Sequence, residues 1–286
     1  MQISLCNEVL AHLPLAQQCE LAAKLGYDGL EIAPFTLSDT PEKISAGEAA
    51  NIRATVESFG LVVTGLHWLL VKPTGLSLTD PDAALRARTL DVMKRLTGLC
   101  AELGGAVLVH GSPKQRQVAP GDAHATAMAR LQDSLAEVAK AAAANGVVYC
   151  IEPLSQNETQ LLNTVAQTAD VVRTINHPHL RTMIDCSAAG LSETEPVPDL
   201  IDRWLPSGLI GHIQVNDPNR HGPGQGDMKF APILAALQRN HYAGVIAVEP
   251  FDYVPDGAGV AAFSIGYLKG LLENLALLET MHPGAV

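Results

Sequence analysis

The sequence has few basic residues and no basic tract. Of its 286 residues, 19 are Lys or Arg and 30 are Asp or Glu, which gives a formal net charge of -11. A surface that binds nucleic acid or an anionic membrane needs a footprint of Lys and Arg. No apolar run approaches the length that spans a bilayer. We therefore expect neither a nucleic-acid partner nor a membrane partner.

The sequence also lacks a secretory signal and a pattern of paired cysteines. Its start, "MQISLCNEVL", has no basic region followed by an apolar segment. Five cysteines are an odd number, and their spacing is not that of a metal site; they stand at positions 6, 19, 100, 150 and 186. Reduced thiols in a cytoplasmic protein are the simplest interpretation.

What the sequence does contain is a regular alternation of short apolar runs and longer helical patterns. Most of the runs are continuously apolar, which is typical of strands buried on both faces of a parallel sheet. The eight candidate strands are "ISLCN" (3–7), "GLEIA" (29–33), "LVVTGLH" (61–67), "AVLVH" (106–110), "VVYCIE" (147–152), "RTMID" (181–185), "LIGHIQV" (209–215) and "GVIAVE" (244–249).

Amphipathic helices are predicted between these strands. One is expected to start with Thr79 or Asp80 as its N-cap and to end at the glycine pair 104–105, and the last to run over about 262–281. Eight strand–helix repeats without a linker predict an α/β protein that forms one (β/α)8 TIM barrel, a single domain over residues 1–286. A doubly wound open sheet is the alternative, but "LCNEVLAHLP" lacks its usual Gly-rich loop.

Polar residues end four successive strands, at the rim where such barrels place their active sites. Glu152, Asp185 and Glu249 end the fifth, sixth and eighth strands, and the seventh carries His212 and Gln214. An acid that follows an apolar strand is costly to bury without a partner. Structural ion pairing is one explanation, but three acids and a His-x-Gln pair favour convergence on a cation.

The predicted ligand set is rich in oxygen. It favours a hard divalent metal, with Mn2+ first, Mg2+ next and Co2+ as a substitute, over structural zinc. His212 is expected to be a fifth ligand or a supporting residue. The four predicted ligands are Glu152, Asp185, Gln214 and Glu249.

Other residues at the strand ends are weaker candidates for substrate contact. His67 and Trp68 follow the third strand, His110 ends the fourth, and Glu158 lies in the loop after the fifth. A lone histidine is more often a hydrogen-bonded structural residue. Trp68 could equally cover the barrel mouth, and Glu158 could cap the following helix.

At these residues the chain resembles the xylose-isomerase-like TIM-barrel superfamily of sugar isomerases and epimerases. Two subfamilies are most similar, the ketose 3-epimerases and the hydroxypyruvate isomerases. The matching segments are "IEP" (151–153), "ID" (184–185), "GHIQ" (211–214), "NRHGPGQGD" (219–227) and "YAGVIAVEPF" (242–251).

The resemblance also implies roles for individual residues. It places the two Glu, one Asp and one His ligands of the epimerases on the predicted set, so Gln214 replaces the epimerase histidine. Hydroxypyruvate isomerases resemble this chain in having Gln at that position. Glu158 and Arg220 match substrate-contacting positions, whereas Ala188 stands where the epimerases have a substrate-binding histidine.

The expected reaction is proton transfer at a carbon next to a carbonyl of a small sugar. The metal would hold the ketose oxygens and stabilise an enediolate, while Glu152 and Glu249 act as general base and general acid. Epimerisation and aldose–ketose isomerisation both remain open. The alternatives are a metal-dependent lyase or dehydratase, a sugar- or metal-binding protein without turnover, and an endonuclease IV-like repair enzyme, which the acidic chain fits poorly. The sequence leaves a homo-oligomer open.

Overall fold

The computed structural model describes residues 1–281, and within them eight strands close into one parallel barrel. The strands pair in chain order, and β1 pairs with β8 to complete the circle. The predicted TIM barrel is thus confirmed and the open sheet excluded. The strands are β1 (Gln2–Cys6), β2 (Gly29–Ile32), β3 (Val62–Leu66), β4 (Val107–His110), β5 (Val148–Ile151), β6 (Leu180–Asp185), β7 (Ile210–Val215) and β8 (Val245–Val248).

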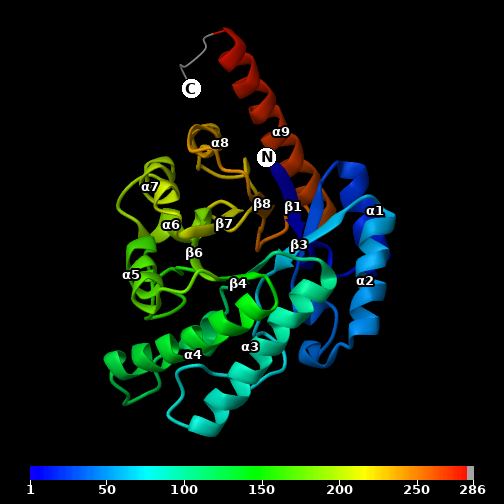
Figure 1. Ribbon diagram of the computed structural model, residues 1–286. Helices are drawn as coiled ribbons and strands as arrows, with labels where there is room; N and C mark the ends of the chain where they lie inside the picture. Colours follow the sequence, from blue (N-terminus) through cyan, green and yellow to red (C-terminus); the bar gives the residue numbers. More distant parts are fainter. Residues whose placement is uncertain (282–286) are drawn as a thin grey trace.

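Helices follow the strands and surround the barrel (Figure 1). They bury one apolar face each against it, as Leu96, Leu99 and Leu103 do on α3. The α-helices of the described residues are α1 (Leu15–Leu25), α2 (Ala46–Ser58), α3 (Ala83–Leu103), α4 (His124–Ala144), α5 (Val165–Ile175), α6 (Cys186–Ser192), α7 (Val197–Trp204), α8 (Phe230–Arg239) and α9 (Gly257–Met281).

Each apolar run that the sequence marked as a strand is one. The runs are continuous because the barrel strands have side chains both in the barrel interior and under the helices, so that Leu108, Ile151, Ile184 and Ile213 are all fully buried. Parallel pairing also brings the carboxyl ends of all the strands to one rim. Polar residues that end the strands therefore meet there.

The predicted N-cap of α3 is wrong by two or three residues. Its N-cap is Asp82, whose side chain accepts a hydrogen bond of 2.8 Å from the amide of Ala84. Thr79 is buried and donates its hydroxyl to the carbonyl of Gln117 in the next loop, while the Asp80 side chain accepts from the amide of Asp82. The tertiary contact of Thr79, which the local pattern does not contain, removes it from the cap.

Helix α9 begins five residues earlier than predicted and is unusually apolar. Its stretch Gly257–Leu278, with a mean hydropathy of 1.2, is long and apolar enough to cross a membrane by length and composition. The expectation that no run approaches that length is therefore wrong. A third of its apolar window is buried, α9 packs against α1 and α8, and Val260, Ile265 and Leu268 are among its buried residues. Core helices of barrels pass the same test of composition.

The close pairing of β2 and β3 depends on Gly29. A Cβ at this position would lie 2.5 Å from the carbonyl oxygen of Val62 and 2.8 Å from Cγ2 of Thr64. We expect Gly29→Ala to lower the free energy of unfolding by about 1–3 kcal/mol, because the backbone of β3 must shift. The matched control is Gly47→Ala in α2, where a Cβ meets no atom within 4 Å; it should be neutral or stabilising by up to about 1 kcal/mol. Urea unfolding of both variants measures the difference, and equal midpoints would contradict the close approach.

Candidate active site

Three carboxylates from three strands meet at the rim of the barrel. Glu152 follows β5 directly, Asp185 is the last residue of β6, and Glu249 follows β8 directly. One side-chain oxygen of each lies within 4.8 Å of those of the other two, and all three side chains are buried. The structure therefore brings together the three acids that the sequence placed at the strand ends.

Burial and mutual repulsion govern the protonation of these acids. Burial, followed by the charge of Asp185, raises the pKa of Glu152 well above its ordinary value. Burial and the neighbouring Glu152 do the same to the pKa of Glu249. Burial raises the pKa of Asp185 to about 7, although hydrogen bonds from Ala188 and Asn216 oppose the rise. The group therefore takes up protons, or needs a cation, near neutral pH.

Asn216 holds two of the three acids in place, and the sequence did not single it out. Its amide nitrogen donates to Oδ2 of Asp185 at 2.7 Å and to the carbonyl oxygen of Glu249 at 3.0 Å. Its amide oxygen accepts from the backbone N–H of Ser187 at 2.8 Å. Because Asn216 directly follows β7, it bridges the ends of β6 and β8 without adding charge.

The third acid is held by Arg116, a second residue that the sequence did not single out. Arg116 ends the short helix η4 (Pro113–Arg116) and is fully buried. Its Nη2 donates to the backbone carbonyl of Glu152 at 2.6 Å, and its own carbonyl accepts from the hydroxyl of Thr159. The guanidinium thus fixes the backbone at the end of β5 and lowers the pKa of Glu152 against the larger effect of burial.

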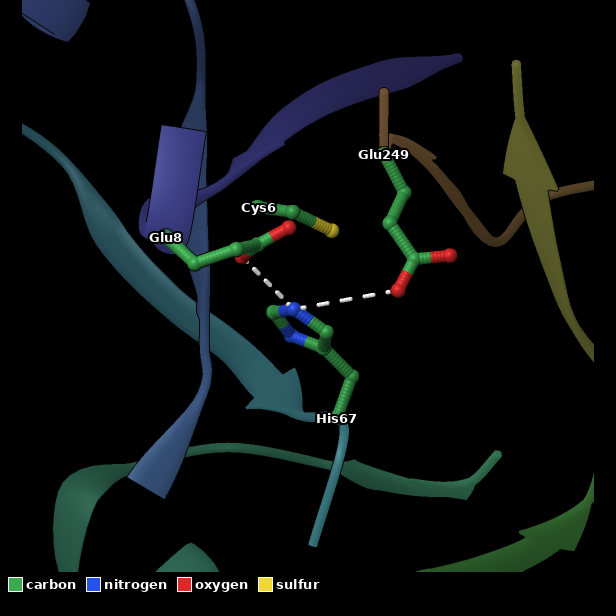
Figure 2. Close-up of side chains that lie close together, drawn as sticks. All are labelled: Cys6, Glu8, His67 and Glu249. Carbon is green, nitrogen blue, oxygen red and sulfur yellow. Dashed lines mark hydrogen bonds and ion pairs between the residues drawn. The ribbon is translucent and has the colours of Figure 1, made fainter. Parts of the chain in front are cut away.

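His67 lies between Glu249 and Glu8, which belongs to the short helix after β1 (Figure 2). Its Nε2 lies 2.7 Å from Oε2 of Glu8 and 3.8 Å from Oε1 of Glu249. Burial lowers the pKa of His67, but the charge and hydrogen bond of Glu8 together with the charge of Glu31 leave it raised. A protonated His67 would lie between two acids, which makes it a positioning residue for Glu249. Glu8 carries no signal in the sequence because it lies in η1 (Asn7–Leu10), outside the regular strand pattern.

Cys6, Glu8, His67 and Glu249 form a second cluster, in which the potential metal-binding atoms lie within 4.8 Å of one another. It is a poorer metal site than the three carboxylates. Glu8 and His67 already form a hydrogen bond, and burial together with Glu31 raises the pKa of the Cys6 thiol well above its ordinary value. Cys6 is one of five cysteines that are all free and buried, in agreement with the interpretation of reduced thiols.

His212 and Gln214 lie beneath the rim, where both meet Glu31 of β2. Nε2 of His212 is 2.7 Å from Oε2 of Glu31, and Nε2 of Gln214 donates to Oε1 of Glu31 at 2.8 Å. Burial alone would raise the pKa of Glu31, but the neighbouring His212, the charge of His67 and the hydrogen bond from Gln214 leave it lowered. Oε1 of Gln214 has no hydrogen-bond partner within residues 1–281 and Gln214 pairs with Asp185 in the sheet. It therefore stays a predicted oxygen ligand, and His212 is a buried partner of Glu31.

A cavity of about 310 Å³, here called the barrel-mouth pocket, opens above the acids. Its walls include Glu152, Asp185, Glu158, Ala188, Arg220 and Phe251. Oε2 of Glu158 accepts hydrogen bonds from the amide and hydroxyl of Ser155, as a cap does. Arg220 lies over the ring of Phe251 at 5.1 Å and pairs with Asp252 at 3.1 Å. Glu158 and Arg220, which the resemblance predicts to contact the substrate, thus both line this pocket.

The two remaining candidates differ in their surroundings. His110 is fully buried, with Nδ1 at 2.7 Å from the hydroxyl of Tyr149. Burial and then the charge of Arg116 lower its pKa to about 3, so the ring is neutral at neutral pH. Trp68 is half-buried, lies between Phe35 and Phe251, and lines a neighbouring cavity. Only Trp68 of the two has access to solvent.

Known proteins share this architecture and part of this sequence. D-psicose 3-epimerase of Ruminiclostridium cellulolyticum is 31% identical over 81% of this chain and 76% of its own length. The 3-dehydro-D-guloside 4-epimerase of Escherichia coli is 22% identical over 94% of this chain and 99% of its own. A crystal structure of a D-psicose 3-epimerase in the presence of D-fructose superposes with a TM-score of 0.80, at 22% identity, and covers 95% of this chain and 99% of that one.

The match to a family is continuous over most of the barrel. Residues 19–271, from within α1 into α9, match the family described as xylose isomerase-like TIM barrel. This range includes the acids that end β5, β6 and β8 and the loops that form the barrel-mouth pocket. The chain belongs to the xylose isomerase-like TIM-barrel family.

Proposed function

We propose that the protein is a divalent-metal-dependent sugar isomerase or epimerase that acts on a ketose or related keto-sugar. The single observation that carries this proposal is the convergence of Glu152, Asp185 and Glu249 beside the barrel-mouth pocket. Support comes from the relatives, which are named as sugar epimerases and are therefore isomerases.

The residues present fit a hard divalent cation. The donors are carboxylate oxygens, and Oε2 of Glu249 and Oε1 of Gln214 are buried without a hydrogen-bond partner in the described part of the chain. A cation of charge +2 would relieve the electrostatic repulsion among three buried acids. Glu152, Asp185, Gln214 and Glu249 would hold it, and Mn2+ is the metal that we propose, with Mg2+ or Co2+ as substitutes.

Such a cation would supply electrostatic stabilisation of the negative charge that develops on the substrate oxygen during deprotonation. The proton itself is moved by the protein. Glu152 and Glu249, on β5 and β8, would act from two sides of the substrate, one as general base and the other as general acid. Return of the proton to the opposite face of the same carbon is epimerisation, and return to the neighbouring carbon is isomerisation.

The surrounding residues would set the geometry of these two glutamates. Arg116 fixes the backbone of Glu152 and His67 lies against Glu249, so each side chain has a defined direction. Glu158 and Arg220 would bind hydroxyl groups of the sugar from the wall of the pocket. The cytoplasmic location and a homo-oligomeric state stay predictions from the sequence.

Replacement of either glutamate by glutamine tests the proton transfer. We expect Glu152→Gln and Glu249→Gln each to lower the exchange of the substrate α-proton with solvent by at least about a hundredfold, because an amide cannot accept the proton. Proton NMR in D2O, with Mn2+ and a panel of ketoses and aldoses, measures the exchange and identifies the carbon. The control is Glu57→Gln on the surface of α2. Exchange at the normal rate in both variants would refute the mechanism, and an unsaturated, UV-absorbing product would favour the lyase.

The acids also predict how pH and metal act on stability. Because the pKa of Asp185 is raised to about 7 in the fold, the metal-free protein binds more protons than the unfolded chain between about pH 4 and 7. Its stability therefore falls as pH rises through this window, and the raised pKa of Glu152 and Glu249 adds in the same direction. A cation that replaces these protons should raise the melting temperature more at pH 8 than at pH 5.5.

Melting curves with EDTA or with Mn2+ at several pH values measure this effect. In the EDTA-treated protein, Asp185→Asn should reduce the loss of stability that accompanies rising pH, since the amide has no proton to lose. An equal gain from Mn2+ at pH 5.5 and pH 8 would contradict the expectation.

A further inference from the structure

A second cavity adjoins the barrel-mouth pocket and has no part in the proposed proton transfer. It has a volume of about 460 Å³ and lies between the loop after β3 and the loop after β4. We call it the outer pocket. Its walls include Trp68, Val71, Thr74, Pro113, Gln115 and Glu158.

The two cavities meet at a defined boundary. Glu158 lines both of them. On the other side, the ring of Trp68, in the outer pocket, lies 5.8 Å from the ring of Phe251, in the barrel-mouth pocket. The two cavities are therefore neighbours that share the wall residue Glu158 and meet again at the contact of Trp68 with Phe251.

The walls of the outer pocket are held in place without a ligand. The hydroxyl of Ser112 accepts from the amide of Leu70 at 3.0 Å, and the carbonyl of Gln115 accepts from the amide of Leu78 at 2.8 Å. These two hydrogen bonds tie the loop after β3 to the loop after β4. The pocket is thus a feature of the folded chain that needs no induced closure.

Trp68 is held in an unfavourable backbone conformation at this boundary. Its φ is 51°, in the left-handed region, which a bulky residue rarely adopts and which is energetically unfavourable. Packing between Phe35 and Phe251, at 5.9 and 5.8 Å between ring centroids, keeps the indole where it is. Strain of this kind persists where the surrounding structure over-determines it, and it is concentrated at binding sites.

The chemistry of the outer pocket fits a neutral ring and not a phosphate. Among the described residues that line it, Lys114 is the one cation, and Glu158 is a carboxylate of opposite charge. A phosphate site would gather several basic groups or backbone amides. The outer pocket instead offers an indole face, the apolar Val71 and Pro113, and neutral hydrogen-bonding groups.

We propose that the outer pocket is a subsite for a neutral ring, so that the substrate is a keto-sugar joined to a second sugar or to an aromatic group and not a free ketose. The proposal rests on the proposed function for the reacting end of the substrate. The reacting sugar occupies the barrel-mouth pocket, and the attached ring lies against Trp68. A free monosaccharide fills only the first pocket and leaves the second to water.

Binding of sugars that lack a ketone tests the subsite independently of turnover. Isothermal titration calorimetry, with the Mn2+-loaded protein, would compare cellobiose, phenyl β-glucoside, methyl β-glucoside and glucose 6-phosphate. We expect cellobiose or phenyl β-glucoside to bind about tenfold more tightly than methyl β-glucoside, as expected for one ring stacked on an indole. The better of the two identifies the ring as a sugar or an aromatic group.

Fluorescence places the bound ring at Trp68. The chain has two tryptophans, and Trp204→Phe leaves Trp68 as the one that reports. A saturable change in the emission of Trp68 on addition of the better glycoside, with the same Kd as in calorimetry, supports the subsite. Equal affinity for methyl β-glucoside, tighter binding of glucose 6-phosphate, or no saturable binding of either ring-bearing glycoside would overturn it.

Variants separate a subsite from a structural cover of the barrel mouth. Trp68→Ala should remove the tenfold preference for the ring-bearing glycoside, and Trp68→Phe should retain most of it. Thr74→Trp, which fills the outer pocket from an exposed wall position, should also remove the preference, whereas Thr174→Trp on the exposed face of α5 should keep it. If Trp68→Ala weakens all sugars by the same factor, Trp68 is only a cover and the proposal fails.

The two proposals fail in different ways. Absence of any ring preference in the unaltered protein, with normal α-proton exchange on free ketoses, would reject the subsite and leave the proposed function. Tight binding of glycosides without exchange on any keto-sugar, including keto-glycosides, would reject the proposed function and leave the subsite as a binding site.

Discussion

Repulsion among buried carboxylates is the constraint on which the rest of this site depends. Glu152, Asp185 and Glu249 have oxygens within 4.8 Å of one another, and all are out of water. At about 4 Å and an effective dielectric constant of about 20, two such charges repel by about 4 kcal/mol. The barrel imposes this arrangement, because parallel strands end at one rim. The fold therefore keeps the acids together only by protonation or by a positive charge between them.

The supports around the acids add little positive charge, and this choice has a chemical consequence. Asn216 is neutral, and Arg116 donates to a backbone carbonyl of Glu152 and not to its carboxylate. Only His67 lies directly against an acid, and it shares its charge with Glu8. A direct arginine pair would hold the pKa of a glutamate low and would weaken it as a base. The present arrangement leaves the charges of Glu152 and Asp185 without a direct cationic partner among the described residues, as the proposed metal site with basic glutamates would require.

The sequence predicted the barrel and the three acids because both depend on local patterns. Continuous apolar runs give buried parallel strands, and the residue after each run must lie at the rim. The predictions failed or were silent where a contact joins distant segments. Glu8 and Arg116 lie in short 3-10 helices without a periodic pattern, and Asn216 follows β7 at the rim but its bridging role depends on contacts with β6 and β8. The α3 cap is Asp82 because Thr79 bonds to Gln117. His212 of β7 meets Glu31 of β2 only because the barrel closes, although the two strands are not neighbours in the sheet. No local pattern in the sequence contains this contact.

Gln214 illustrates the different roles of the barrel strands and of the loops above them. The amide nitrogen of Gln214 donates to Glu31, which leaves the amide oxygen free to act as a neutral metal ligand. Gln214 is the neighbour of Asp185 in the sheet. A neutral oxygen can serve a hard cation without adding to the repulsion among the acids. Under the proposed function, the strand ends would set only the charge and the geometry for proton transfer, which many sugars could use. Substrate choice must then come from the loops: from Ala188, where a histidine side chain would occupy space in the barrel-mouth pocket, and from Trp68 and its neighbours after β3 and β4. Since these loops can change without disturbing the acids, the same strand ends can serve sugars of different size.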